Sequence, residues 1–409
     1  MSIAKKFYTK EGFSTCFGCE ACVQICPKNA IQMVEDQEGF RYPSVSDICI
    51  ECGLCENICP YDNPPIRSKE EKFVFGGYHT DPAIRFDSTS GGAFSAIVET
   101  YCDKNYVIFG AKADGLNVYH SLTTDKNDIS VFRKSKYTQS IIGNSYKQVK
   151  QLLKEGKKVL FSGTPCQIAG LKTFLGKCDQ TKLLSIEVIC EGVPSPLYVR
   201  KLDLHFFSKY GCHIESIDYR YTGKAFCQRG KWDFQQTRIV VEGTKKEIKK
   251  DRWFNPFWSV WLKHLMSRPS CYECPFTTQE RVADITLGDL WGVHLYCPEL
   301  YGKNGGSSLI VANTDKGKSV VKEAQNLMFG HELRFEDALR YQSPMRRSIG
   351  ENPLRDACME DLQNDMTYDE INKKWATPPN AKLLYQKYIW GNRQKILWWN
   401  LKQKFKHQR

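Results

Sequence analysis

The sequence predicts a small cysteine-rich domain followed by a larger domain of mixed α/β or α+β class. The 409 residues exceed the usual size of one domain, which is about 150 residues. A spaced cysteine pattern occurs twice before residue 60, and strand-like and helix-like runs alternate after residue 73. With 41% hydrophobic and 25% charged residues, the chain has the composition of a globular protein and not of a disordered one.

The chain contains 18 cysteines, and their environment decides what they do. The first residues lack the apolar core of a secretory signal, and no run of about 18 apolar residues occurs that would span a membrane. We therefore expect a cytoplasmic protein in a reducing compartment. There, metal binding is a more common role for clustered thiols than disulfide formation.

Two copies of the pattern C-x2-C-x2-C-x3-C-P open the chain. In such a duplication, three thiolates of one copy bind a cubane iron–sulfur cluster and the fourth comes from the other copy. This predicts one 4Fe–4S cluster on Cys16, Cys19, Cys22 and Cys59 and a second on Cys49, Cys52, Cys55 and Cys26. Zinc knuckles are the alternative, but they favour paired C-x2-C units. Residues 13–61 resemble the bacterial two-cluster ferredoxins, so we predict a ferredoxin domain over residues 1–65 that relays single electrons.

A linker and a larger domain follow. The Pro64-Pro65 pair and the charged residues after it indicate a linker that ends near residue 72. Strands are expected at 73–78, 107–113, 158–162, 183–189, 238–242, 246–249, 285–287 and 309–312. Helices are expected at 91–104, 146–154, 167–175, 197–210 and 257–266. These elements predict a mixed α/β domain over residues 73–330.

Four further cysteines stand at strand ends or in a C-x2-C-P turn: Cys166, Cys190, Cys271 and Cys274. Together they could form a third four-thiolate site, although buried free cysteines are also common. Six cysteines lack such surroundings and are interpreted as core or surface thiols: Cys102, Cys178, Cys212, Cys227, Cys297 and Cys358.

Three segments are candidates for binding an organic cofactor. The first precedes a helix, where backbone N–H groups can hold a pyrophosphate or simply cap the helix: Ser88, Ser90, Gly91 and Gly92. The second offers cations next to Arg133, hydroxyls and an aromatic ring that suit a flavin, or else forms a solvated loop: Lys134, Lys136, Tyr137, Gln139 and Ser140. The third comprises strand ends, where ligands of α/β sheets gather: Gly163, Thr164, Gly288 and Asp289.

Several stretches resemble the coenzyme F420 hydrogenase/dehydrogenase β-subunit family. They are STSGGAFSAI, KSKYTQS, LFSGTPCQIAGLK, ICEGVPSP and CYECPF…RVADITLGDLWG, within residues 73–312. The ferredoxin-plus-β-subunit arrangement is similar to versions encoded beside polysaccharide-biosynthesis enzymes and to chlorophyll-pathway vinyl reductases. The resemblance implies FAD and one 4Fe–4S cluster in the larger domain, with Cys166, Cys190, Cys271 and Cys274 as the cluster ligands.

The expected function is that of an iron–sulfur flavoprotein oxidoreductase. It would pass single electrons through 4Fe–4S clusters to FAD for the two-electron reduction or oxidation of a small molecule or a deazaflavin-like carrier. A ferredoxin-like redox partner protein and a setting in polysaccharide biosynthesis are expected. The alternatives are a non-catalytic electron-transfer subunit and an iron–sulfur sensor. No residue is assigned a catalytic role, since Asp289 could donate a proton or cap a turn.

The chain has a formal net charge of +12, which favours anionic partners, but no nucleic-acid recognition motif is present. Residues 331–409 are predicted to form a helical extension with a basic tail. From residue 382 the tail mixes tryptophans and leucines with lysines and arginines. Such a helix could lie on the inner face of an anionic membrane or dock on the main domain.

Overall fold

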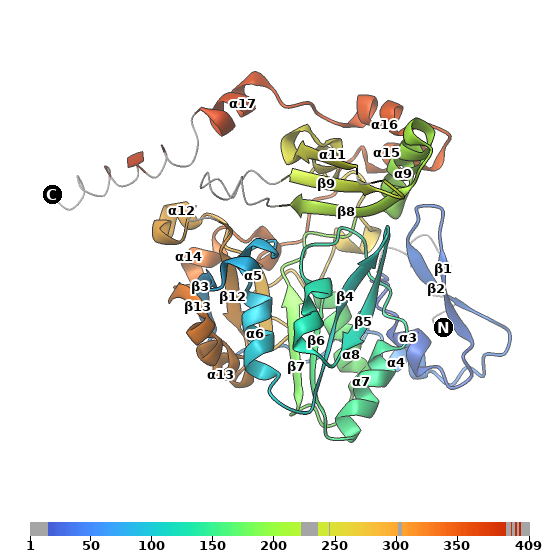
Figure 1. Ribbon diagram of the computed structural model, residues 1–409. Helices are drawn as coiled ribbons and strands as arrows, with labels where there is room; N and C mark the ends of the chain where they lie inside the picture. Colours follow the sequence, from blue (N-terminus) through green and yellow to red (C-terminus); the bar gives the residue numbers. More distant parts are fainter. Residues whose placement is uncertain are drawn as a thin grey trace.

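The computed structural model describes residues 15–221, 236–244, 246–301, 305–389, 394, 397–398 and 401. A small N-terminal unit lies beside a large central sheet, and a second, smaller sheet with its own helices covers one end of that sheet (Figure 1). The mixed α/β class expected from the sequence is confirmed.

The N-terminal unit consists of two short helices and a hairpin. Its elements are α3 (Ala21–Ile25), β1 (Ile31–Glu35), β2 (Arg41–Val45) and α4 (Leu54–Asn57). β1 and β2 pair antiparallel, with Ile31 opposite Val45. Each helix directly follows the C-x2-C turn of one cysteine motif, so the repeat in the sequence becomes a repeat in the structure.

The N-terminal unit docks firmly on the main domain. α3 contacts α7 (Ser145–Lys154) and α8 (Pro165–Leu175) of the larger domain. The Glu20 carboxylate accepts the Gly143 N–H at 3.0 Å. The Gln24 side-chain oxygen accepts the Tyr146 N–H at 2.9 Å, which satisfies a backbone donor in the first turn of α7.

The central sheet has eight strands in the order β13-β3-β12-β11-β7-β6-β4-β5. The strands are β3 (Phe73–His79), β4 (Tyr106–Asp114), β5 (Asn117–Thr123), β6 (Lys158–Gly163), β7 (Leu183–Val188), β11 (Ile285–Asp289), β12 (Ser308–Ala312) and β13 (Met328–Glu332). β11, β7, β6 and β4 are parallel, whereas the outer neighbours pair antiparallel.

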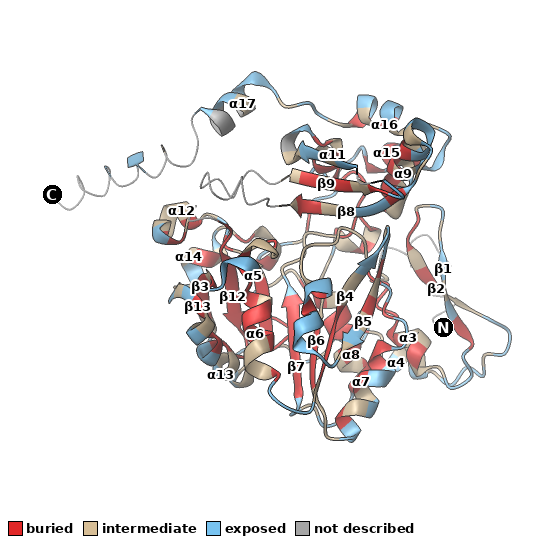
Figure 2. Cartoon of the chain, viewed as in Figure 1, coloured by how far each residue is buried: buried red, intermediate tan, exposed pale blue. Residues whose placement is uncertain are grey.

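Apolar side chains alternate across this sheet and fill a core on each face. On β6, Val159 and Phe161 join the cluster formed with α7 and α8, while Leu160 joins the opposite cluster with α6 and α13. The central strands are accordingly the most deeply buried part of the fold (Figure 2).

The helices and 3-10 turns around the sheet are α5 (Pro82–Phe86), α6 (Ala93–Tyr101), η1 (Lys126–Phe132), η3 (Pro269–Cys271), α12 (Val293–Tyr296), η4 (Pro298–Leu300), α13 (Asp315–Ala324), η5 (Gln325–Leu327), α14 (Phe335–Leu339) and η6 (Ser343–Met345).

A second, antiparallel sheet has the order β10-β9-β8. Its strands are β8 (Ile214–Tyr221), β9 (Gln236–Val241) and β10 (Glu247–Asp251). The helices near it are α9 (Pro196–Tyr210), η2 (Arg252–Phe254), α11 (Pro256–Trp261), α15 (Arg355–Gln363), α16 (Tyr368–Trp375) and α17 (Ala381–Tyr388). Tyr198, Trp258 and Met359 belong to one apolar cluster that joins α9, α11 and α15.

The helix predicted over residues 257–266 is shorter in the structure. α11 ends at Trp261, and His264 has a left-handed φ of 58°. This turn reverses the chain so that Ser267 forms a bridge to Pro194. The turn thereby delivers Arg268 to the loop that follows β7, where its N–H donates to the Val193 carbonyl.

The C-terminal tail is described only in part. No helix in the described residues is long and apolar enough to cross a membrane. Leu397, Trp398 and Leu401 are exposed. Trp390, Trp399 and Phe405, which the sequence suggested for membrane contact, lie outside the described residues.

Candidate functional site

Cys16, Cys19, Cys22 and Cys59 line one narrow cavity, together with apolar residues of the hairpin and of α3. Cys19 is 9% exposed. Its sulfur lies 3.0 Å from the position that a Cβ at Gly170 of α8 would take, so the glycine allows α3 and α8 to approach closely. Burial raises the pKa of all four thiols, so they ionise readily only when a bound cation replaces their protons.

Cys26, Cys49, Cys52 and Cys55 line a second cavity of about 340 Å³. This cavity is open, and Cys52 is exposed. The first and second cavities are close, because α3 contacts α4 and the charges of Cys22 and Cys55 interact. The two sets of four cysteines are the sets expected from the sequence.

The backbone wraps both sites in the same way. Gly18 and Glu20 in the first motif have φ of 63° and 61°. At the equivalent places of the second motif, Glu51 and Gly53 have φ of 50° and 72°. Each turn therefore has two left-handed residues, which let successive N–H groups point toward the space between the thiols.

Cys166, Cys190, Cys271 and Cys274 line a third cavity, although they are spread over 109 residues of sequence. Cys166 opens α8 directly after β6, and Cys190 follows β7. The other two lie in and just after η3. Burial raises the pKa of the Cys271 thiol to about 11 and that of Cys274 to about 12. Phe17 lines both this cavity and the first one, so the two cavities adjoin.

A large cavity of about 490 Å³ lies at the carboxyl ends of the parallel strands. It shares Cys190, Gly192, Val193 and Pro344 with the third cavity. The structure brings eight of the predicted cofactor residues to its wall: Lys134, Lys136, Tyr137, Gln139, Ser140, Gly163, Thr164 and Asp289.

A buried histidine supports this wall. His120 Nε2 lies 2.9 Å from the Ser162 carbonyl oxygen, so this nitrogen carries the hydrogen. The Ser140 hydroxyl donates to Nδ1 at 3.0 Å and accepts from the Gln167 amide at 3.0 Å. Burial lowers the pKa of His120 to about 4, so the ring is neutral near pH 7. The chain of bonds fixes the loop before α7 to the start of α8.

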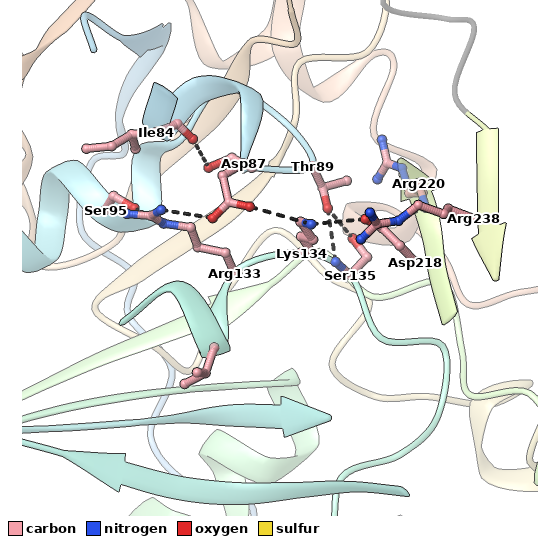
Figure 3. A network of polar contacts seen from close by, with 12 residues as sticks. Ile84, Asp87, Thr89, Ser95, Arg133, Lys134, Ser135, Asp218, Arg220 and Arg238 are labelled. Atoms are coloured by element: carbon pink, nitrogen blue, oxygen red, sulfur yellow. Dashed lines mark hydrogen bonds and ion pairs between the residues drawn. The ribbon is translucent and has the colours of Figure 1, made fainter. Parts of the chain in front are cut away.

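An ion network borders the large cavity (Figure 3). Arg133 pairs with Asp87 at 3.0 Å. Lys134 pairs with Asp218 at 3.0 Å and with Asp87 at 3.5 Å. These two cations are therefore balanced by carboxylates. Lys136 instead donates to backbone carbonyls, and burial lowers its pKa to about 8.

Five predicted residues do not line the large cavity: Ser88, Ser90, Gly91, Gly92 and Gly288. The Gly91 N–H donates to the Ser308 hydroxyl at 2.8 Å, and the Ser90 hydroxyl donates to the Ser307 carbonyl. A Cβ at Gly288 would lie 2.5 Å from Ile189. The glycine-rich turn thus packs against β12 and starts α6.

Sequence reasoning missed several residues of the cavity walls. Arg220 pairs with Asp289 at 2.6 Å, so the Asp289 carboxylate is held in a buried ion pair. The lining of the large cavity also includes basic and aromatic residues that were not predicted: Arg252, Trp258, Trp261, Trp291 and Tyr341. In the third cavity, Arg268 and Arg281 were also missed. These residues come from distant segments and form no pattern in the sequence.

The other cysteines in the described residues line none of these four cavities: Cys102, Cys178, Cys212, Cys297 and Cys358. Cys227 lies outside the described residues.

Two family models match the chain. The model for the C terminus of the coenzyme F420 hydrogenase/dehydrogenase beta subunit matches residues 156–329. The model described as "4Fe-4S dicluster domain" matches residues 15–63. Both resemblances inferred from the sequence are thereby confirmed.

The curated relatives described next are all named as ferredoxins. An uncharacterized ferredoxin of Methanocaldococcus jannaschii is 29% identical over 115 residues, which are 28% of this chain and 63% of that protein. A 7Fe ferredoxin of Hydrogenibacillus schlegelii is 43% identical over 47 residues, 11% of this chain and 55% of that protein. The chain thus spans less than two thirds of the length of these two relatives.

A ferredoxin of Alicyclobacillus acidocaldarius is 36% identical over 67 residues, which cover 15% of this chain and 81% of that protein. A chain of the F420-reducing nickel–iron hydrogenase complex from Methanosarcina barkeri is similar in structure, with a TM-score of 0.43 and 14% identity over 76% of this chain and 94% of that one. Through its N-terminal region the chain belongs to the 4Fe–4S ferredoxins, and its residues 156–329 match the C-terminal domain of coenzyme F420 hydrogenase/dehydrogenase beta subunits.

Proposed function

We propose that the protein is an oxidoreductase that carries single electrons from its surface through three 4Fe–4S clusters to FAD in the large cavity. The observation that carries this proposal is the arrangement of four neighbouring cavities in a series. The second is open to solvent at Cys52, the first is buried, and the third adjoins both the first and the large cavity. Closely spaced sites of this kind suit stepwise electron transfer.

The ferredoxin clusters are assigned to the two sets of thiols around the first two cavities. The inner cluster takes Cys16, Cys19, Cys22 and Cys59, and the outer cluster takes Cys26, Cys49, Cys52 and Cys55. Each set combines three thiols of one motif with the fourth of the other, as two-cluster ferredoxins do.

The third cluster is assigned to Cys166, Cys190, Cys271 and Cys274. All four line one small cavity without a disulfide between them. The chemistry of the donor set fits a cubane cluster, because four soft thiolates are its usual ligands. Zinc would accept the same ligands, so the metal content needs measurement.

FAD is assigned to the large cavity. Its volume is within the range of cofactor sites, and its walls combine aromatic rings, hydroxyls and basic groups. A flavin supplies the exchange between one-electron and two-electron chemistry. Tyr137 is held edge-on by Trp258 and Trp261, so this aromatic wall is rigid. The remaining space would admit a small substrate or a deazaflavin-like carrier.

A protein partner would exchange electrons at the outer cluster. Ile48, Ile50 and Leu54 are exposed beside the second cavity. Residues 15–63 contain eight acidic and two basic residues, a net charge of −6, in a chain of net charge +12. This supports contact with a basic redox protein. It also favours the second candidate function, a non-catalytic subunit that passes electrons to a separate catalytic chain.

Two further proposals each rest on a single observation. A role in polysaccharide biosynthesis rests on the resemblance to proteins encoded beside such enzymes. Peripheral membrane contact rests on the exposed Leu397 and Trp398 of the basic tail. Unchanged partition of the chain into anionic vesicles after deletion of residues 394–409 would remove the membrane proposal.

The decisive test is anaerobic reconstitution of the full chain, followed by iron, sulfide and flavin analysis. We expect about twelve irons, four for each of three cubane clusters, and one FAD. Cys190→Ser should lose about four irons, whereas Cys212→Ser, which changes a thiol outside the cavities, should lose none. About eight irons and no flavin would contradict the proposal. If the protein reduces an artificial acceptor only after a second polypeptide is added, the result would favour the second candidate function, a non-catalytic electron-transfer subunit.

A further inference from the structure

A single arginine lies between the first and third cavities. Arg268 is 1% exposed and sits three residues before Cys271. Its Nε donates to the Cys16 carbonyl at 2.9 Å, and one Nη donates to the Arg41 carbonyl at 2.9 Å. Its side chain also lines the third cavity. One guanidinium therefore contacts the loop of the inner ferredoxin site and the wall of the third site.

The same guanidinium reaches toward the large cavity. Its other Nη donates to the Gln139 side-chain oxygen at 3.0 Å. The Gln139 amide in turn donates to the Phe17 carbonyl at 2.7 Å. Gln139 belongs to the wall of the large cavity, and Phe17 to the walls of the first and third. Arg268 thus lies where three of the four cavities meet.

Arg268 forms no ion pair with a carboxylate in the described part of the chain. Its three side-chain hydrogen bonds end on neutral oxygens, and it lies over the Tyr42 ring at 4.4 Å. A buried cation without a paired counter-ion is strongly unfavourable. By contrast, Arg281 at the same cavity pairs with Glu187. The charge of Arg268 acts on the carboxylates of Glu20 and Asp36 without an ion pair to either, and on the sulfurs of Cys16, Cys166 and Cys271 in the surrounding sites.

The sequence of the ferredoxin motif makes room for this charge. A Cβ at Gly18 would lie 2.9 Å from both terminal nitrogens of Arg268. The guanidinium therefore packs directly on the C-x2-C turn of the inner site. A cubane cluster with four thiolates is an anion, and nearby charge and hydrogen bonds set its potential.

We infer that Arg268 is the shared counter-charge of the inner ferredoxin cluster and the third cluster, and that it raises the reduction potentials of both. This inference rests on the proposed third cluster. Arg268 acts as a positioning and tuning residue, because it touches the ligand loops and no reacting atom. Cys52 of the outer set is exposed to solvent, which screens charge, and the contacts of Arg268 with the cysteine motifs are made to Cys16 and Gly18 of the first one, so the outer potential should not depend on Arg268. The added electron then resides preferentially at the two buried clusters.

The test is a redox titration of the anaerobically reconstituted full chain, followed by electron paramagnetic resonance. Signals are assigned by comparison with Cys52→Ala and Cys190→Ala, which remove the outer and third clusters. In Arg268→Gln, the ratio of reduced to oxidised inner and third cluster at a fixed potential should fall at least tenfold, equal to about 59 mV for a one-electron couple. Arg268→Lys should stay closer to the wild type. The outer cluster should not change.

The matched control is Glu38→Gln/Arg355→Gln. Arg355 also joins the larger domain to the N-terminal unit, but its Nη1 lies 2.9 Å from the Glu38 carboxylate and 3.2 Å from the Asp356 carboxylate, so its charge is balanced by carboxylates. If Arg268 only fastens the two domains, the control and Arg268→Gln should lower stability alike and leave all potentials unchanged. That result would overturn the inference. If the wild-type protein binds only about eight irons, the third cluster is absent and the shared role of Arg268 is overturned with it. This outcome is recognised from the iron count, before any redox titration.

A second pair of variants covers the case in which Arg268→Gln binds too little iron. Gln139→Glu keeps Arg268 and places a carboxylate at the oxygen that accepts its Nη–H. Both Gln139→Glu and Gln139→Met lose the amide donor to the Phe17 carbonyl, and Gln139→Met also loses the acceptor for Arg268 without adding charge. We expect a downward shift of the inner and third potentials in Gln139→Glu only. Equal potentials in the two variants would also overturn the inference.

Discussion

The two cysteine motifs share one sequence pattern and one backbone shape, yet they have opposite surroundings. Phe17 in the first motif is 6% exposed, whereas Ile50 at the same place in the second is 56% exposed. Ala21 and its counterpart Leu54 are 1% and 42% exposed. The first motif faces α7 and α8, and the second faces solvent. The repeat therefore encodes the ligand turns, and the residues between the cysteines decide which site is buried.

The exchange of glycine and glutamate between the motifs has a physical cause. Both turns need two left-handed residues, and each motif has one glycine and one glutamate there. At Gly18 a side chain would displace the guanidinium of Arg268, whereas the side chain of Glu20 accepts the Gly143 N–H. In the second motif, nothing lies within 4 Å of a Cβ at Gly53. In the first motif, contact with the larger domain thus determines which of the two left-handed positions carries a side chain.

The largest expected difference concerns the ligands themselves. Cys19→Ser and Cys52→Ser should each lose about four irons. Cys19→Ser should also lower the melting temperature clearly, because its sulfur is part of the core between α3 and α8. Cys52→Ser changes an exposed side chain, so its melting temperature should follow that of protein lacking the outer cluster. Iron analysis and calorimetry under anoxia check this. Equal destabilisation by both variants would contradict the difference in burial.

The second difference concerns access. Air or a chelator should remove the outer cluster first, because its ligand Cys52 is exposed whereas Cys19 of the inner set is buried. Iron release from wild-type protein should therefore be biphasic, with the fast phase missing in Cys52→Ala. A single phase that is unaffected by this variant would mean that both sites open together.

A third comparison tests packing at equivalent positions. Ala21→Leu adds volume to a closed core and should cost about 1–3 kcal/mol of unfolding free energy. Leu54→Ala removes a partly exposed side chain and should change stability by about 0.5 kcal/mol or less. Denaturant titration of the reconstituted proteins measures both. A larger effect for Leu54→Ala would place that residue in an interface, for example between two copies of the chain.

The smallest expected difference concerns backbone conformation. Gly18→Ala should cost about 1–2 kcal/mol for the left-handed residue, with a further penalty from contact with Arg268. Glu51→Ala should leave stability within about 0.5 kcal/mol, since that position already carries an exposed side chain. Melting temperatures of the two variants suffice as a readout. Similar losses would show that the contact with Arg268 is unimportant.

The sequence predicted local features well and distant contacts poorly. The strands at residues 158–162 and 183–189 have continuous apolar runs and appear as β6 and β7. The cysteine spacing grouped the same thiols that line the first two cavities, and their assignment as cluster ligands stays a prediction. The helix predicted at 257–266 is too long, because the left-handed turn at His264 serves a contact with the loop after β7. β5 and β8 have mixed polarity and were not expected.

The residues that join the cavities could not be recognised from the sequence. Arg268 is one of many basic residues, and only folding brings it beside Cys16, 252 positions away. Arg220 is paired with Asp289 across two sheets, and no spacing marks that pair. The glycine-rich turn at Gly91 was a reasonable phosphate site by composition. Its N–H donor is already used by Ser308, which the sequence does not reveal.

The docking of the N-terminal unit has a consequence for how the protein can be built. Glu20, Gln24 and Arg268 fasten the ferredoxin unit to the larger domain by bonds that do not involve the linker near residue 66. The unit is thus seated as a fixed module and does not swing on a tether. The end of the connecting peptide is bonded to the larger domain as well, through the Ser68 N–H that donates to the Arg281 carbonyl at 3.1 Å. The ferredoxin unit and the larger domain, made as two separate polypeptides, should therefore be able to assemble into the same electron-transfer chain.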